Sequence, residues 1–336
     1  MNSIERILAA INFAPPDRTP VMPQIFAHAA IISGRSILDY VQNGALAADC
    51  QLAALRQYGH DNVFAATDVC LEVEALGASL RFAPDIYPAV LQPPLTVLSD
   101  IAALQVPDPR RAGRMPELLA MAGKLRQAVG DETLVVGMVQ GPMTLALQLL
   151  GPEAALYFAA DDSERFETLL DFCADVAIRF GLAQMEAGVH LPLVFEPGGC
   201  PEVVPPGYFR ELLAPRLTRI FSAFKQAGAP VNWLHIAGRT LPILPMYAGV
   251  GVTLGNFDYC VEAERLHDDV ILPFCVDGNI RSLAFIDDEP EQIAAEAHRL
   301  IRIFNGRGGF ILSSGCEIPP ESKPANVAAL VAAVHS

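Results

Sequence analysis

Eight apolar runs, each bounded by Gly, Pro, Asn or Asp, recur along the chain and constrain its fold more than any other feature. They lie at 19–24, 62–66, 134–139, 191–195, 230–236, 251–254, 270–276 and 309–312. Strict alternation of polar and apolar residues is missing from them. The runs therefore predict strands that are buried on both faces, as in a parallel sheet.

Segments with helical periodicity separate most of these runs. We expect helices at 163–186, 208–227 and 289–304, with acidic residues near several of the starts, where the helix dipole favours negative charge. A further helix is expected at 3–12, capped by Ser3 and stopped by the two prolines at 15 and 16. Eight strand–helix repeats predict an α/β fold, the (β/α)8 or TIM barrel.

The gap between the second and third runs is too long for one helix. Within it, 74–82 and 84–94 resemble the two arms of a hairpin, and we expect residues 75–110 to form an insertion over the barrel mouth. No linker or low-complexity tract divides the chain. Residues 1–336 are therefore expected to form a single domain, which is a common length for an α/β barrel.

Composition and charge narrow the class of protein. Hydrophobic residues make up 52% and charged residues 18%, enough apolar surface for a large core. A formal net charge of −15 without a basic stretch argues against binding to nucleic acids or anionic membrane surfaces. The first residues lack the features of a signal peptide, and the seven cysteines contain no Cys-x-x-Cys pair. We expect a cytoplasmic protein with reduced thiols.

Polar residues just beyond the carboxyl ends of parallel barrel strands are the first candidates for chemistry. Taken singly, each is more often a helix cap or a loop hydrogen-bonding group than a functional residue. The candidates are Gln24, His28, Asp68, Gln140, Thr144, Glu196, Cys200, His235, Arg239, Asn256, Asp258, Asp277, Asn279, Cys316 and Glu317.

His235 and Cys316 stand out among them, because each closes an apolar run and both side chains are of types that bind zinc. A catalytic zinc ion takes three protein ligands and leaves one position for substrate. A lone His is usually a satisfied core residue, however, and a buried Cys usually packs without reacting. The pair suggests half of a zinc site, and Ala237 stands where a second thiol would have completed it.

Several segments resemble, in order and spacing, the uroporphyrinogen decarboxylase superfamily. They are Asp-Arg-Thr-Pro-Val (17–21), Tyr-Gly-His-Asp (58–61), Met-Val-Gln-Gly-Pro-Met-Thr-Leu-Ala (138–146), Leu-His-Ile-Ala-Gly (234–238), Asp-Gly-Asn-Ile (277–280) and Gly-Cys-Glu-Ile-Pro-Pro (315–320). The likeness covers nearly the whole chain. Within the superfamily, the chain is more similar to the methylcobalamin:coenzyme M methyltransferase branch than to the true decarboxylases.

The resemblance implies transfer of a methyl group between a corrinoid and a thiol or similar acceptor that zinc activates. It implies His235 and Cys316 as catalytic residues and metal ligands, and it adds Asp68 as a catalytic candidate. The cofactor-binding candidates are Gln140, Asn256, Asp258 and Asn279, and the substrate-binding candidates are Arg239, Gln24 and His28. Arg239 would pair with a sulfonate or carboxylate on the acceptor.

The chain has no Asp-x-His-x-x-Gly segment of the kind that binds a corrinoid. The resemblance therefore implies that a partner corrinoid protein brings the methyl group to the barrel mouth. A homodimer is also compatible with the high apolar content.

Two departures separate the chain from the decarboxylases. Those enzymes carry Arg-Gln-Ala-Gly-Arg after the first strand, whose arginines bind substrate carboxylates, and here that stretch is Pro-Gln-Ile-Phe-Ala-His (23–28). They also carry Gly-His-Gly late in the chain, where this chain has Gly-Cys-Glu (315–317). Asp68 does match the region in which decarboxylases place an aspartate against pyrrole NH groups, so a tetrapyrrole decarboxylase stays an alternative.

One departure counts against the methyltransferase branch, which has His-x-Cys-Gly where this chain has Ala237 after His235. A zinc site would need another third ligand. We expect Glu196 in this role, with Cys200, Asp258 and Cys275 as alternatives. A third hypothesis is a non-catalytic barrel that binds a small ligand or a corrinoid protein and has lost its chemistry together with the cysteine.

Overall fold

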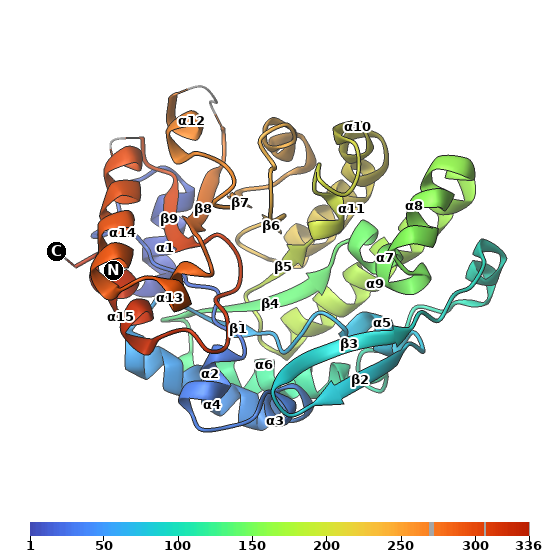
Figure 1. Ribbon diagram of the computed structural model, residues 1–336, viewed down its shortest axis with the longest axis horizontal. Coiled ribbons are helices and arrows are strands. Elements are labelled where there is room, and N and C mark those ends of the chain that lie inside the picture. Colours follow the sequence, from blue (N-terminus) through green and yellow to red (C-terminus); the bar gives the residue numbers. More distant parts are fainter. Residues whose placement is uncertain (269–271, 306, 336) are drawn as a thin grey trace.

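Seven strands form one curled parallel sheet in the order β1-β4-β5-β6-β7-β8-β9, with helices on its outer side (Figure 1). The computed structural model describes residues 1–268, 272–305 and 307–335. The architecture is α/β and barrel-like, as the apolar runs predict. The strands are β1 (Asn62–Ala65), β4 (Leu134–Gln140), β5 (Leu191–Phe195), β6 (Trp233–His235), β7 (Leu254–Asn256), β8 (Cys275–Ile280) and β9 (Phe310–Ser314).

The strand expected at 19–24 is reduced to a single parallel bridge between Val21 and Leu312. Met22 N donates to Leu312 O at 2.9 Å, and Asp61 N donates to Val21 O at 2.9 Å. The segment thus bonds to β9 on one side and to the residue before β1 on the other. Prolines at 20 and 23 lack the N–H that a longer ladder needs, so pairing stops within three residues.

Three strands begin at least three residues later than their apolar runs, and one of them is β6, which begins at Trp233 in the run 230–236. The run 251–254 starts in a turn, because Gly251 ends a short helix with a φ of 88°, and β7 begins only at Leu254. Positions 270 and 271 of the run 270–276 lie outside the described residues, and β8 begins at Cys275. Asn256, Asp277 and Asn279 therefore belong to strands, where the sequence had placed them in the loops that follow.

Helices α4, α6 and α9 pack against the early strands of the sheet, and α14 packs against β8 and β9. The α-helices are α1 (Ser3–Ile11), α2 (His28–Ile32), α3 (Ile37–Gln42), α4 (Gly44–Tyr58), α5 (Leu71–Ala75), α6 (Met115–Val129), α7 (Pro142–Leu150), α8 (Pro152–Asp161), α9 (Ser163–Ala187), α10 (Pro206–Tyr208), α11 (Ala214–Gln226), α12 (Ala263–Asp268), α13 (Ala284–Asp287), α14 (Pro290–Phe304) and α15 (Pro324–Ala332). Short 3-10 turns are η1 (Leu98–Ala103), η2 (Pro197–Gly199) and η4 (Leu244–Val250), and η3 (Phe209–Leu213) is a π-helical turn.

No single described helix is long and apolar enough to cross a membrane, although α7 and α8, which meet at 112°, pass such a test as a pair.

Two expected helix boundaries differ from those observed. Asn2, and not Ser3, caps α1, and a capping box with Glu5 completes the cap. The single helix expected at 208–227 is divided into α10, the π-helical turn η3 and α11. Pro215 stands at the start of α11 and cannot donate a backbone hydrogen bond to the preceding turn, which accounts for the irregular entry.

An antiparallel hairpin lies in the long gap between β1 and β4. It consists of β2 (Ser79–Ala83) and β3 (Ile86–Gln92). The Tyr87 hydroxyl accepts a hydrogen bond from Ala27 N at 2.8 Å and donates one to the Glu317 carboxylate. The hairpin is thereby tied to the two loops that follow Val21 and β9.

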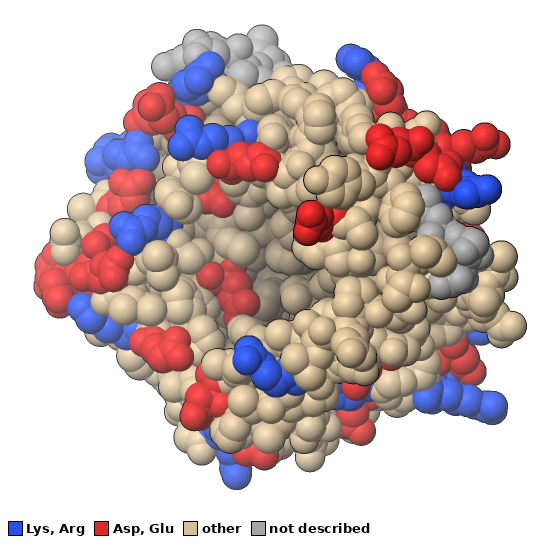
Figure 2. Space-filling view, turned by 45° about the vertical axis from the view of Figure 1, so that its right-hand side comes forward, with Lys and Arg blue, Asp and Glu red and all other residues tan. Residues whose placement is uncertain are grey.

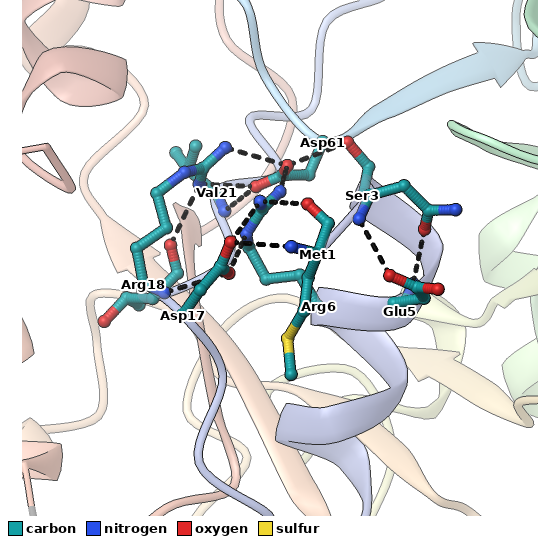
Figure 3. Close-up of polar contacts among 10 residues, drawn as sticks. Met1, Ser3, Glu5, Arg6, Asp17, Arg18, Val21 and Asp61 are labelled. Atoms are coloured by element: carbon teal, nitrogen blue, oxygen red, sulfur yellow. Dashed lines mark hydrogen bonds and ion pairs between the residues drawn. The ribbon is translucent and has the colours of Figure 1, made fainter.

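The buried carboxylate of Asp61 joins the first elements of the chain at the amino ends of the strands (Figure 3). It accepts hydrogen bonds from the guanidinium groups of Arg6 and Arg18, from Ser3 Oγ and from Val21 N, all at 2.7–2.9 Å. Arg6 also pairs with Asp17 at 2.7 Å. The segments 17–21 and 58–61, which are two of the resembling motifs, therefore meet in a structural ion cluster.

Candidate functional site

The last residues of several neighbouring strands lie in register and share one side of the sheet. Gln140 pairs with Phe195, Phe195 pairs with His235, and Asn256 pairs with Asp277. Paired residues of parallel strands point to the same face. We call this row of strand-end residues the upper tier.

The upper tier faces the interior of the curled sheet. Trp233 Nε1 donates to Asp277 Oδ1 at 2.8 Å, although β6 and β8 are separated by β7. Only side chains that point inward can bond across a strand in this way. Because side chains alternate along a strand, His235 points to the same side as Trp233.

His235 is fully buried and held from across the interior. Gln24 Nε2 lies 3.3 Å from His235 Nδ1, and the imidazole stacks on the Phe195 ring with a centroid distance of 5.1 Å. Burial lowers the pKa of His235 to about 3, so the ring is neutral at physiological pH. His235 Nε2 has no hydrogen-bond partner among the described residues.

The loop after β9 carries Cys316 to the same group of residues. Asn256 Nδ2 donates to Gly315 O at 3.2 Å, and Gln24 N donates to Ser314 Oγ at 3.2 Å. The Cys316 side chain is half-buried, and burial raises the pKa of its thiol to about 12. As the structure stands, this thiol is protonated and is a weak nucleophile.

Asp258 and Gln140 add further buried polar atoms. Asp258 Oδ2 accepts a hydrogen bond from Gly238 N at 2.7 Å, while Oδ1 has no partner among the described residues. Both side-chain amide atoms of Gln140 are buried without a partner as well, and so is Asn256 Oδ1. Unpaired buried polar atoms of this kind mark a place where a polar ligand is accommodated.

Glu196, the expected third zinc ligand, lies on the other side of β5. Its carboxylate accepts hydrogen bonds from Met143 N at 2.9 Å and from Thr144 N and Oγ1 at 2.7 and 2.6 Å. Glu196 therefore caps the start of α7, and Thr144 donates two of the hydrogen bonds to this cap. Glu196 follows Phe195 directly, and alternation along the strand turns it away from His235.

Three other candidates are engaged in structural contacts. Asp68 accepts hydrogen bonds from Arg114 at 2.5 and 3.2 Å, and His28 lies between Pro320 O at 3.0 Å and the Tyr58 hydroxyl at 2.9 Å. Asn279 donates to Asp258 O and Val261 O at 3.2 and 2.9 Å. In the part of the chain that the structure describes, none of these three side chains is hydrogen-bonded to His235 or Cys316.

Arg239 does not reach into the site. Its side chain is 74% exposed and pairs with Glu202 at 3.5 Å. Cys200 also lies beside Glu202, with Sγ 3.8 Å from Oε2. The sequence-based role of Arg239 as an anion-binding group therefore has no support in the geometry.

The donor set does not fit zinc. Among the residues that the structure describes, no three His, Cys, Asp or Glu side chains gather in an arrangement that could hold a metal ion. Glu196 is committed to α7, Ala237 offers no donor, and Cys275 lies at the start of β8, two residues below Asp277. His235 and Cys316 together would supply at most two of the three ligands that a catalytic zinc takes.

Sequence reasoning missed Phe195, Tyr87 and Arg114. Phe195 forms the aromatic wall beside His235, Tyr87 ties the hairpin to Glu317, and Arg114 neutralises Asp68. Strand register would have indicated Phe195, since Phe195 ends β5 as His235 ends β6. Tyr87 and Arg114 act over long sequence distances and carry no local signal.

The strand-end face is hollowed. In Figure 1 the arrowhead of β4 points to the right, and Figure 2, which brings that side forward, shows a central hollow with acidic side chains on its wall. This end of a parallel barrel is where ligands bind in barrels of this class.

Comparison with known proteins agrees with this architecture. A family model described as uroporphyrinogen decarboxylase (URO-D) matches residues 2–336. The chain belongs to the uroporphyrinogen decarboxylase family. Among its relatives, the chain is 28% identical over 334 residues to the uroporphyrinogen decarboxylase of Syntrophotalea carbinolica, covering 96% of this chain and 94% of the relative.

Methyltransferases of the same family are equally similar. The methylcobamide:CoM methyltransferase MtaA of Methanosarcina barkeri is 28% identical over 344 residues, covering 98% of this chain and 96% of the relative. A solved methyltransferase from Methanosarcina mazei superposes with a TM-score of 0.90 at 26% identity, covering 100% of this chain and 98% of that one. The family is thus shown, while sequence identity does not separate the two activities.

Proposed function

We propose that this chain is a methyltransferase that moves a methyl group between a corrinoid on a partner protein and a small substrate at the upper tier. The observation that carries this proposal is the charge of the site. Arg6 and Arg216 are the buried Lys or Arg residues among those described, and both lie in outer helices and are ion-paired with carboxylates. A methyl-transfer substrate is small and does not need a cluster of cations.

A porphyrinogen substrate makes the opposite demand. Its carboxylates require several free guanidinium or ammonium groups at the mouth. Arg114, which is near Asp68, is already bound to Asp68 and Glu74 at 2.5 and 2.8 Å. Decarboxylation of a tetrapyrrole is the second candidate, favoured by the position of Asp68 after β1, but the Asp68 carboxylate would first have to leave Arg114.

The reaction itself is a displacement at carbon. When the substrate accepts the methyl group, its lone pair forms the new bond to carbon, and the cobalt–carbon bond breaks with its electron pair left on cobalt, which is reduced from Co(III) to Co(I). The reverse direction runs the same bonds backwards. The chain must hold the substrate in line with the methyl group and exclude water.

Residues of the upper tier are suited to hold and orient such a substrate. Neutral His235, fixed by Gln24, presents Nε2, and the amides of Gln140 and Asn256 present further donors and acceptors. We assign no step to zinc, because the described side chains do not complete its ligand set. We place the reaction in the cytoplasm, in keeping with free thiols at all seven cysteines.

The test compares both activities on the same preparation. Methylcobalamin is supplied as methyl donor with small thiols and amines as acceptors, and loss of the methyl–cobalt absorbance is followed together with the mass of the product. We expect methyl transfer that falls at least tenfold in His235→Ala and stays unchanged in Gln226→Leu, an exposed position at the end of α11. Decarboxylation of uroporphyrinogen without any methyl transfer would overturn the proposal, and inactivity in both assays would favour a non-catalytic barrel.

A further inference from the structure

The upper tier and the two segments next to it, at Gln24 and Asp258, combine unpaired hydrogen-bonding atoms with one unpaired carboxylate oxygen. Gln24 Oε1, Asn256 Oδ1 and Asp258 Oδ1 are acceptors without a partner among the described residues. Asp258 itself is 6% exposed, and Asn256 and Gln24 are more deeply buried still. Acceptors therefore dominate, and one of them carries negative charge.

No cation balances that charge within the described part of the chain. Burial raises the pKa of Asp258, while hydrogen bonds from the backbone N–H groups of Gly238, Tyr259 and Cys260 lower it, and none of the described ion pairs involves Asp258. Arg239 is turned outward to Glu202, and Arg281, on the strand-end side of β8, pairs with Asp287 at 2.5 Å. An anionic ligand would meet Asp258 with no partner of opposite charge, whereas a cation would meet an acceptor.

The backbone of Gly315 approaches Asp258 closely. A Cβ atom added at Gly315 would lie 3.1 Å from this oxygen and 3.0 Å from Tyr259 N. Any side chain at 315 would therefore press on the Asp258 carboxylate and on the backbone of Tyr259. Phe195, half-buried beside His235, offers an aromatic face in the same tier, and aromatic faces attract organic cations.

We infer that the small substrate of this site is an organic cation of the quaternary ammonium class, bound by the Asp258 carboxylate, and that it serves as the methyl donor. This inference rests on the proposed methyl-transfer function. It runs against the anionic acceptor that Arg239 suggested from the sequence.

The chemistry of such a donor balances without a proton. The carbon–nitrogen bond breaks with its electron pair kept by nitrogen, and the methyl carbon bonds to the Co(I) corrinoid of the partner, whose cobalt is oxidised to Co(III). The substrate leaves as a neutral amine. Its charge is lost in the step, so the product binds Asp258 more weakly than the substrate until it leaves the site and takes up a proton from water.

Binding is tested first, without any corrinoid. Choline, its uncharged isostere 3,3-dimethylbutan-1-ol and the anion 2-mercaptoethanesulfonate are titrated into the full-length chain by calorimetry. We expect choline to bind about tenfold more tightly than the isostere, as one carboxylate contact warrants, and the anion not to bind. Asp258→Asn keeps the acceptor for Gly238 N and should abolish the preference for choline, whereas Asp175→Asn, on the exposed face of α9, should keep it.

A second variant guards against a folding defect. Gly315→Ala leaves every charge in place and should weaken choline binding, because the added methyl group displaces Asp258 Oδ1 from its position. Binding of 2-mercaptoethanesulfonate in place of choline, or a choline preference that survives in Asp258→Asn, would overturn the inference.

Methyl transfer is then assayed from tetramethylammonium to Co(I) cobalamin. Transfer to or from the anionic thiol alone would overturn the inference and leave the proposed function standing. Cation binding without methyl transfer from any donor would overturn the proposed function while the assignment of the ligand class survives.

Discussion

Gln24 and His235 are hydrogen-bonded across the interior of the sheet, with Gln24 Nε2 3.3 Å from His235 Nδ1. The amide comes from the segment beside β9, and the imidazole ends β6 on the opposite wall. An amide N–H that donates to Nδ1 leaves the proton of the neutral ring on Nε2. His235 then presents a donor to the upper tier, where acceptor atoms outnumber donors.

Replacing Gln24 should therefore change the tautomer as well as the rate. We expect Gln24→Leu to lower kcat/KM for methyl transfer by about fivefold, the equivalent of one lost hydrogen bond of roughly 1 kcal/mol. Gln24→Glu should shift the proton to Nδ1, which its carboxylate accepts. The nitrogen chemical shifts of His235 report the tautomer. Unchanged nitrogen shifts in both variants would show that Gln24 does not set the tautomer of His235. An equal loss of rate in the exposed control Gln226→Leu would contradict the role of Gln24 as well.

A second buried pair makes stability depend on pH. Burial raises the pKa of Asp277 to about 7, and Trp233 Nε1 donates to it at 2.8 Å. An unfolded Asp titrates near 4, so between about pH 4 and 7 the folded chain binds more protons than the unfolded one. The contribution of Asp277 to stability is therefore fully present below about pH 4 and is lost as the pH rises through about 7.

Asp277→Asn should remove this pH dependence while keeping an oxygen for Trp233. We expect the variant to be more stable than the native chain by about 1–3 kcal/mol at pH 8, and the difference to shrink or reverse at pH 5. Urea unfolding at both pH values measures it. Parallel pH profiles for the two proteins would show that Asp277 does not titrate in this range.

The sequence predicted an α/β, barrel-like fold with buried parallel strands, but not which candidate residues share a face. The strands that end at Phe195 and His235 could be recognised from the sequence, because a buried strand is a local run of apolar residues. Glu196 could not be placed from that signal alone. Its distance from His235 follows from a one-residue difference in register, and such a shift moves a side chain to the opposite face.

Interactions between distant segments account for the other differences. The sequence gives no sign that Asp68 is ion-paired, because its partner Arg114 lies 46 residues further along the chain. The segment 19–24 forms a single bridge and not the expected strand, because two prolines interrupt its hydrogen-bond ladder. The residues around Val21 bond instead to Leu312 and Asp61. The periodicity of apolar residues indicates which side chains are buried. Which residues they pair with depends on how distant segments pack in the fold.

The missing third donor can be restored to test the zinc hypothesis. Ala237 follows His235 by two residues and is half-buried. We expect native protein to hold much less than one zinc per chain and Ala237→Cys to approach one, because a thiolate at this position completes a three-ligand set. Elemental analysis after dialysis measures the content, with Ala237→Ser as the matched control. One zinc per native chain, lost in His235→Ala, would mean that another side chain supplies the third bond.

Replacing Asp68 tests whether its carboxylate is structural or catalytic. Its bonds to Arg114 are at 2.5 and 3.2 Å, and the Arg114 side chain is 11% exposed and also bound to Glu74. Removing one partner of such a pair leaves a poorly solvated charge, so Asp68→Ala should cost about 3 kcal/mol of unfolding free energy in urea. Asp68→Ala combined with Arg114→Leu should recover part of that loss, since no unpaired charge remains. If Asp68→Ala instead kept its stability and lost only turnover of a tetrapyrrole, the carboxylate would be catalytic and the decarboxylase alternative would gain its strongest support.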